Sequence, residues 1–439
     1  MKESTKWWLM SLIMAVLVTG LTLSVGPVTK VSAKVTLRFS DWHLTEAHWE
    51  KALKEGMVIF EKAHPDIEVV LEPVSYGEKE TKYITASIAG QAPDVMHLHA
   101  YSLRSFIEKG YCLDLTPFVE KEKEDFLKAW YTKPLTLCSY EGKLYAMPGD
   151  YMAQVLVRNT EMFKEAGLDP AKPPKTWDEF LEYAQTLTVD KDGDFKVDQW
   201  GFGMIGAKDP GFELRFSPFL WTFGGDYLTS GFKYSSLDTP QALEAFKFFV
   251  GLYRQYGVVP PGATACGCTD VRTQLAQRKV AMNIGSGWTA PIVHSMNPEL
   301  NAFEVLEYSA VPMKVARVTS AWLSAWIISP NTKHPEEAWE LAKFITSREM
   351  ELKWFRDASV LSSREDVSGV VPEILEDKHA KVVASELAYA KFVPQIKEWP
   401  EIIDAVTTGI QNALIGVETP EKSMAKAHAR INAILARGR

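Results

Sequence analysis

Short strand-like runs alternate along this chain with longer amphipathic helical segments, and this alternation restricts its fold more than any other feature. Val35–Phe39 alternates apolar and polar residues as a strand does, and residues 45–63 place apolar side chains at helical spacing. Further strands are predicted at 67–71 and 94–98, with one or two helical turns at 83–89 between them. Strand–helix–strand alternation implies parallel pairing, so we expect an α/β fold with helices on both faces of the sheet.

The same pattern begins again after Tyr151, which indicates a second α/β unit. Helices are predicted at 177–187 and 240–256 and a strand at 280–284, while the last stretch, 372–435, is almost wholly helical in its pattern. With 439 residues, the chain is long enough for two or three domains with substantial cores.

The first 33 residues have the three-part order of a secretory signal peptide. Lys2 and Lys6 precede an apolar run over residues 7–18, and small residues up to Ala33 offer a cleavage site. The run is shorter than the roughly 20 apolar residues that span a membrane, and no cysteine lies near it to carry a lipid anchor. We therefore expect export across the cytoplasmic membrane, to the periplasm or the cell surface.

The exported chain is acidic, because without residues 1–33 it keeps 45 basic and 55 acidic side chains. This excess argues against nucleic acid or an anionic membrane surface as the principal partner and leaves a neutral ligand open. Four cysteines are too few for a disulfide scaffold in a chain of this length. Cys112 and Cys138 are candidates for one bridge, whereas the short separation of Cys266 and Cys268 strains a disulfide and leaves that pair undecided.

A series of short motifs runs in a fixed order along nearly the whole mature chain. They are Phe60-x4-Pro65-x-Ile67-x-Val69, Ala89–Val95, Lys109–Thr116, Gly142–Pro148, Arg158-Asn159, Pro174–Phe180, Gly224-Gly225-Asp226, Lys279–Met282 with Trp288, and Pro335–Trp339. Each is unspecific alone, but in this order and spacing they resemble the family 1 extracellular solute-binding proteins, the maltose-binding-protein-like receptors of ABC importers.

The resemblance implies two discontinuous α/β lobes that meet at a hinge around a central ligand cleft, as in type II periplasmic binding proteins. The lobes would comprise 34–150 with 310–358 and 151–309 with 359–439, and the chain would cross between them near 148–152, 309–313 and 355–361. The resemblance further implies a monomer that binds a carbohydrate, closes by hinge bending and docks on permease subunits in the membrane.

A sugar site needs flat aromatic side chains for the apolar face of a pyranose and planar polar groups for its hydroxyls. Trp288 is the first candidate, because it follows the strand 280–284 through glycines that let the backbone approach closely. Trp42 and His43 follow the first strand, and ligands bind α/β sheets at the carboxyl ends of strands. The competing interpretations are a core tryptophan that caps the next helix for Trp288 and packing against its own helix for Trp42.

His97, His99 and Tyr101 lie at the end of the third predicted strand. The two histidines point the same way from a strand, which suggests a metal, but two ligands without a third favour a polar lining of the cleft. Asp150 and Tyr151 lie at the first predicted crossing, where a carboxylate can accept two sugar hydroxyls or form a hinge salt bridge.

Further ligand-binding candidates lie in the second half of the chain: Trp221, Asp226, Trp322, Arg364 and Trp399. The alternatives are an inter-lobe salt bridge for Arg364 and helix packing for Trp399. Members of the family often have glycines where this chain has Ala321-Trp322, so the resemblance implies that part of the cleft is filled here.

A run of aspartates resembles the start of an EF-hand calcium loop, and makes Asp190, Asp192 and Asp194 a weak calcium candidate. Phe195 occupies the position that needs glycine, and Gly201 occupies that of the bidentate glutamate, so coordination would be weak. A hairpin turn with solvated carboxylates is the preferred interpretation, and we expect no metal.

A secreted carbohydrate-active enzyme is the main alternative from another functional class. Glycosidases need two facing carboxylates at a defined separation, and nothing in the sequence pairs Asp150 with Asp226. Because the chain has no Gly-x-Ser-x-Gly elbow, His-Glu-x-x-His helix or phosphate loop, we expect neither enzyme activity nor a cofactor.

Two other cargoes would fit the same fold. A glycerol phosphate would require clustered Arg and Lys in the cleft, and a polyamine would require several carboxylates around aromatic walls. The candidate residues are mostly aromatic and neutral, which favours a carbohydrate, and their number favours more than one sugar ring.

Overall fold

The structure is a computed structural model that describes residues 34–437. The predicted signal peptide at 1–33 lies outside the described residues. Among the helices between residues 34 and 437, none combines the length and the apolar character needed to cross a membrane.

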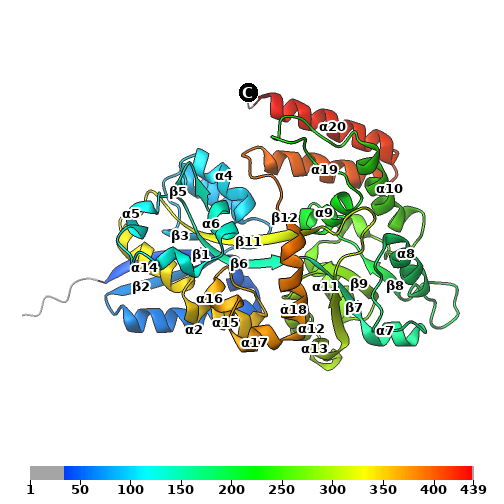
Figure 1. Ribbon diagram of the computed structural model, residues 1–439, viewed down its shortest axis with the longest axis horizontal. Coiled ribbons are helices and arrows are strands. Elements are labelled where there is room, and N and C mark those ends of the chain that lie inside the picture. The colour runs from blue at the N-terminus through cyan, green and yellow to red at the C-terminus, as the bar shows by residue number, and fades with distance from the viewer. Residues whose placement is uncertain (1–33, 438–439) are drawn as a thin grey trace, which may run out of the picture. The chain divides into compact units, whose positions relative to one another are not determined.

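The first of two main sheets has the strand order β12-β11-β3-β1-β2, and β6 pairs with β11 as a further strand (Figure 1). Its strands are β1 Val35–Asp41, β2 Ile67–Pro73, β3 Val95–His99, β6 Met147–Ala153, β11 Thr319–Ile328 and β12 Ala390–Lys391. β1 pairs in parallel with β2 and β3, as the strand–helix–strand alternation predicts, whereas β11 runs antiparallel to β3 and β6.

The second sheet has the order β10-β7-β9-β8. Its strands are β7 Val155–Asn159, β8 Trp200–Gly203, β9 Val280–Gly285 and β10 Leu306–Ser309. β8 and β9 are parallel, and β7 runs antiparallel to β9 and β10. A separate hairpin joins β4 Ser139–Tyr140 to β5 Lys143–Leu144.

Helices surround both sheets (Figure 1). Those that follow strands of the first sheet or pack near it are α2 Ala47–Ala63, α3 Lys79–Ile88, α4 Ala100–Glu108, α5 Thr116–Val119, α6 Thr132–Leu137, α14 Pro335–Ile345, α15 Arg348–Ala358, α16 Glu365–Ser368, α17 Pro372–Glu376 and α18 Lys378–Glu386. The others are α7 Thr160–Glu165, α8 Trp177–Thr186, α9 Phe212–Thr222, α10 Pro240–Arg254, α11 Cys268–Ala276, α12 Thr289–Met296, α13 Ala302–Val305, α19 Trp399–Leu414 and α20 Pro420–Arg437. Short 3₁₀ turns are η1 Trp42–Thr45, η2 Phe126–Ala129, η3 Ala263–Ala265, η4 Pro298–Leu300 and η5 Leu387–Tyr389.

Local sequence signals explain where several helices begin. At α8, Thr176 accepts the backbone N–H of Glu179 while the Glu179 carboxylate reaches back to the backbone of Thr176, which forms a capping box. At α10, the Thr239 hydroxyl caps the helix and Pro240 occupies its first turn, where no N–H is needed. Together, the two sheets and the helices around them confirm the mixed α/β class that was predicted from the sequence.

The last part of the chain is less helical than its pattern predicts. After α18, residues 390–391 form β12 at the edge of the first sheet, paired with Thr319 and Ser320. An irregular segment then leads to α19, which begins at Trp399. The segment 372–435 was predicted to be almost wholly helical; helices cover most of it, and the exception is this strand and the irregular residues after it, where pairing with a distant strand outweighs the local pattern.

Two short segments connect strands of the two sheets, and a third runs beside the first of them. The chain passes directly from β6 to β7 at Gln154, and returns from β10 to β11 through residues 310–318. After α15, residues 359–363 run beside β6, where the backbone N–H of Tyr151 donates to Leu361 and that of Ser363 donates to Gly149, both at 2.8 Å. These segments place residues from both sheets around one cavity.

Candidate ligand-binding site

One cavity of about 570 Å³, including the part open to solvent, is lined from both sides of the molecule. Elements of the first sheet contribute Trp42, His43, Glu46, Trp49, Tyr76, Asp150 and Trp322, and elements of the second contribute Asp209, Arg215, Cys268, Thr269, Arg272, Trp288 and Ile292. Small-molecule sites combine aromatic side chains with a few convergent polar groups, and this lining has both.

Five Trp and Tyr side chains line it: Trp42, Trp49, Tyr76, Trp288 and Trp322. Trp42 lies in η1, directly after β1, and Trp288 is the residue before α12, after β9. The ring centroids of Trp288 and Trp322 are 5.6 Å apart, so rings that arrive from different sheets meet in the cavity.

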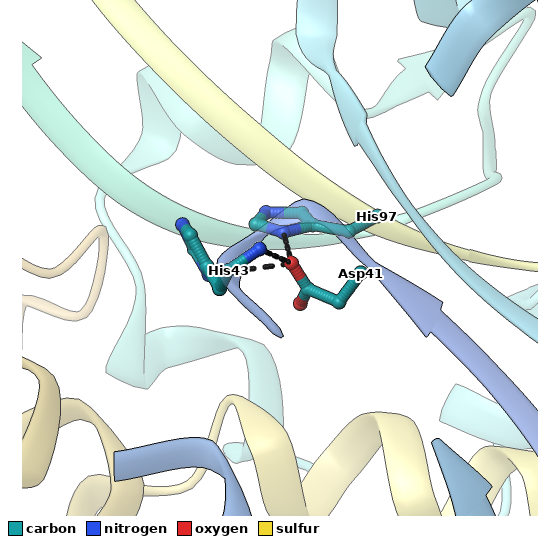
Figure 2. A group of neighbouring side chains, drawn as sticks. All are labelled: Asp41, His43 and His97. Carbon is teal, nitrogen blue, oxygen red and sulfur yellow. Dashed lines mark hydrogen bonds and ion pairs between the residues drawn. The ribbon is translucent and has the colours of Figure 1, made fainter. Parts of the chain in front are cut away.

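A buried network behind Trp42 fixes the orientation of that ring. Asp41 Oδ1 accepts the backbone N–H of His43 at 2.8 Å and lies 2.9 Å from His97 Nδ1, as Figure 2 shows. The His97 ring is stacked between Trp42, at 3.7 Å, and Trp326, at 4.2 Å between centroids. Burial raises the pKa of Asp41 and lowers that of His97.

The same three residues are a possible metal set, because ligand atoms of Asp41, His43 and His97 lie within 4.8 Å of one another. Zinc binds such nitrogen and oxygen ligands. However, the Asp41 carboxylate also accepts the Trp326 indole N–H at 3.4 Å, so both of its oxygens already have donors. The arrangement therefore fits a hydrogen-bonded support for Trp42.

Asp150 supplies a carboxylate to the floor of the cavity from β6. The register between β6 and β11 shifts between Leu323 and Ala325, and this irregularity directs the Ser324 hydroxyl to donate a hydrogen bond to Asp150. Burial raises the pKa of Asp150 to about 7, although the Trp322 indole partly opposes the increase. Asp150 can therefore accept hydroxyl groups when ionised, and its charge changes near neutral pH.

The second sheet brings charged groups that the sequence reasoning missed. Asp209 Oδ1 accepts the backbone N–H of Gly211 at 2.7 Å, and its Oδ2 accepts that of Cys268 at 3.0 Å. Arg215 is 7% exposed and donates one bond of 3.3 Å to the Gly211 carbonyl. No motif marks these residues in the sequence; only the position of Arg215 in α9 and of Cys268 at the start of α11 brings them to the cavity.

Some buried polar atoms around the cavity have no hydrogen-bond partner among the residues that the structure describes. They include the Trp288 indole nitrogen and the Arg215 Nε. Glu213, two positions before Arg215 in α9, has a pKa raised to about 8 by burial. Because a buried polar group without a partner is costly, these atoms indicate where polar groups of a ligand would bind.

Five of the predicted ligand-binding residues line this cavity: Trp42, His43, Asp150, Trp288 and Trp322. His99 and Tyr101 do not line it, although His99 contacts Trp322 with a centroid distance of 4.0 Å. Tyr151 stacks on Phe392 instead, at 6.0 Å.

The other four predicted residues lie elsewhere. The Trp221 indole donates to Asp226 at 3.1 Å, and Lys391 forms an ion pair with the same carboxylate. Trp399 is fully buried at the start of α19, where it contacts Tyr227.

Arg364 is also engaged away from the cavity. Its guanidinium forms an ion pair of 2.7 Å with Asp366 and lies 4.3 Å from the centre of the Trp130 ring. Arg364 therefore contacts Asp366 and Trp130 and does not line the cavity.

The aspartate loop after α8 forms a turn that is held by hydrogen bonds from its backbone N–H groups to its own carboxylates. The Asp190 carboxylate accepts the N–H groups of Gly193 and Phe195, both at 2.8 Å, and the Asp194 carboxylate forms an ion pair with Lys196. Val189 and Gln199 pair across its base, as in a hairpin. Oxygens of Asp190, Asp192 and Asp194 lie within 4.8 Å of one another, but all three side chains are exposed.

All four cysteines are free thiols in this structure. Cys112, Cys138 and Cys268 are buried and Cys266 is half-buried. The bridge considered for Cys112 and Cys138 is therefore not formed here, and the Cys268 thiol donates to Asp209 at 3.1 Å.

Comparison with known proteins identifies the relatives of this arrangement. The family model described as bacterial extracellular solute-binding protein matches residues 42–351. A binding protein of Brucella abortus is 26% identical over 376 residues, which cover 86% of this chain and 88% of that protein. The sn-glycerol-3-phosphate-binding periplasmic protein of Salmonella typhimurium is 29% identical over 185 residues, or 38% of this chain and 39% of its own length. An ABC transporter solute-binding protein of Thermotoga lettingae, solved with α-D-tagatose, has a TM-score of 0.84 at 26% identity and covers 92% of this chain and 100% of its own.

Proposed function

Because this chain belongs to the bacterial extracellular solute-binding proteins, we propose that it is the carbohydrate receptor of an ABC importer. It would bind the sugar in the aromatic cavity and deliver it to permease subunits in the membrane. We further propose that it is exported, acts as a monomer and catalyses no reaction.

One observation carries this proposal: aromatic rings and partnerless polar groups face the same cavity. The rings of Trp42, Trp288 and Trp322 offer apolar surface for the face of a pyranose. The Trp288 indole N–H is a buried donor, and the Asp150 carboxylate is an acceptor. Together they match a ligand that has flat apolar faces and hydroxyl groups at its rim.

A phosphorylated ligand is the second candidate. It is supported by Arg215 and Arg272, which both line the cavity, and by the glycerol-phosphate-binding relative. The carboxyl groups of Glu46, Asp150 and Asp209 line the same space, and their ionised forms repel a phosphate. The mixture of both charges favours a neutral polyhydroxyl ligand, which uses donors and acceptors alike.

Capture would occur by closure of two lobes, made of residues 34–150 with 310–358 and 151–309 with 359–439. The cavity walls come from elements of both sheets, and Gln154 connects the sheets directly, so a small change of backbone angles there would separate the walls. The carboxylate pair Asp150 and Asp226 that a glycosidase interpretation would use is not assembled, because Asp226 is engaged with Trp221 and Lys391, outside the cavity that Asp150 lines.

The test is a thermal-shift screen of residues 34–439 against mono- and oligosaccharides, glycerol phosphates and polyamines. A ligand that binds only the folded protein adds about 2.7 kcal/mol of stability at a hundredfold excess over its Kd. We expect a shift with a neutral saccharide that Trp288→Ala abolishes and that Phe195→Ala preserves, because Phe195 is an aromatic residue 99% exposed outside the cavity.

Two results would contradict the proposal. A shift with glycerol phosphates or polyamines alone would show that the ligand is a charged solute and not a carbohydrate. Release of product from an oligosaccharide incubated with the protein would show that the protein is an enzyme.

A further inference from the structure

Trp322 stands across the cavity and contacts rings on both of its sides. Its centroid lies 4.0 Å from that of His99, 5.6 Å from Trp288 and 6.4 Å from both Trp42 and Tyr76. Trp288 precedes α12 on the side of the second sheet, whereas the other rings lie at or after the ends of strands of the first sheet. The indole therefore fills the space between the two walls.

Both nitrogens of His99, a residue 1% exposed, are buried and lack partners within residues 34–437. Oε1 of Glu213 and Nε of Arg215, in residues 3% and 7% exposed, lack partners there as well. Burial lowers the pKa of His99, and the charge of Arg215 contributes to this lowering. Neither His99 nor Glu213 reaches the ligand cavity. Buried donors and acceptors without partners suit a polar ligand group, yet the Trp322 indole packs against the His99 ring and stands between it and the cavity.

A second cavity, of about 650 Å³ including its open part, lies on the far side of His99 from Trp322. Tyr101 and Ser102 of α4 line it together with Ile403 of α19. The Tyr101 ring is 4.9 Å from that of His99, which in turn contacts Trp322. Three consecutive rings thus separate the second cavity from the first.

We propose that Trp322, backed by His99 and Tyr101, is the end wall of the ligand site, so that the protein captures a saccharide by one chain end. This inference rests on the proposed carbohydrate function and specifies how its ligand is held. Five lining residues are partly or fully exposed, and among them are Glu46, Thr269 and Arg272. Glu46 and Arg272 come from elements of different sheets and their charges interact, so these two meet at one mouth of the cavity. The rest of a longer saccharide leaves through this mouth without making comparable contacts.

The experiment measures affinity against chain length by titration calorimetry. The probes are α-1,4-gluco-, β-1,4-manno- and α-1,5-arabino-oligosaccharides of one to four rings. In the series that binds, we expect the wild-type affinity to change by less than about threefold beyond two rings, because further rings lie in solvent. In Trp322→Ala, we expect adding one ring to the ligand to raise its affinity about tenfold, because hydroxyls of the added ring pair with the nitrogens of His99.

Two further variants separate this effect from loss of folding. Trp322→Leu keeps an apolar side chain at the position and should give a smaller gain in the same direction. Trp339→Leu removes a buried tryptophan of α14 that is not in the cavity, and should leave the wild-type length profile unchanged.

The end wall is wrong if the wild-type affinity climbs about tenfold with the third or the fourth ring. It is equally wrong if both Trp322 variants, folded by their thermal midpoints, retain the wild-type length profile. Absence of binding by the wild-type protein to every series, with a thermal shift from a charged solute, would instead reject the carbohydrate function itself.

Discussion

Replacement of Asp150 by asparagine should stabilise the ligand-free protein at alkaline pH. The Asp150 side chain is 6% exposed, and burial raises its pKa from 3.8 to about 7. Between about pH 4 and pH 7 the folded protein therefore keeps a proton that the unfolded chain releases. Stability falls as the pH rises through this range, and the loss is complete above pH 7.

The size of the effect follows from the same pKa values. One pKa unit corresponds to about 1.4 kcal/mol, so moving the pKa from 3.8 to about 7 corresponds to about 4 kcal/mol. An asparagine side chain at this position does not ionise and can still accept the Ser324 hydroxyl, so the variant avoids this cost. We expect Asp150→Asn to match the wild type near pH 4 and to exceed it by up to about 4 kcal/mol at pH 8.

Urea unfolding of both proteins at pH 4, 6 and 8 measures the difference. Glu213 and Glu351, whose pKa values burial raises to about 8, act with the same sign, so only the difference between the two proteins isolates Asp150. Glu373→Gln is a control in which we expect a change of the opposite sign. Arg356 lowers the pKa of Glu373, so removal of this carboxylate should reduce stability at neutral pH. If Asp150→Asn destabilises the protein equally at pH 4 and pH 8, the argument from burial is refuted.

Three further changes test other parts of the structure. Iodoacetamide should label half-buried Cys266 before the three buried cysteines, and peptide mass spectrometry would contradict this if all four react together. Gly149→Ala places a Cβ atom 2.1 Å from the Trp326 ring, so we expect urea unfolding to report a loss of about 1–3 kcal/mol rather than none. Arg364→Ala removes the stacking on Trp130 and should lower stability by about 1 kcal/mol while leaving ligand affinity within about twofold; a tenfold loss of affinity would show that Arg364 contacts the ligand.

Elements with strong local signals were predictable from the sequence. The strand predicted at 280–284 is β9, Val280–Gly285, and the helix predicted at 45–63 is α2, Ala47–Ala63, preceded by the 3₁₀ turn of η1. Periodicity identifies such elements because a strand or helix must bury one face. β12 was missed because its two residues owe their conformation to pairing with β11.

The candidate site was only partly predictable. Trp42 follows β1 of the first sheet directly, and Trp288 follows β9 of the second sheet after two residues. Ligands bind α/β sheets at the carboxyl ends of strands, so position along the chain sufficed for both. Trp399 and Arg364 have equally suitable residue types, yet Trp399 packs in the core and Arg364 on Trp130. Residue type does not fix which partner a side chain meets.

The sequence by itself determined the α/β class, the family, and the strands that became β1, β2, β3 and β9, because these follow from periodicity and from short motifs in a fixed order. Only the tertiary structure decided which side chains share the cavity. Arg215 and Asp209 reach it because α9 and the loop before it pack against the first sheet, where Ser320 donates to the carbonyl of Leu214 at 2.6 Å. Such contacts join residues more than 100 positions apart, and a separation of that size leaves no local pattern in a sequence.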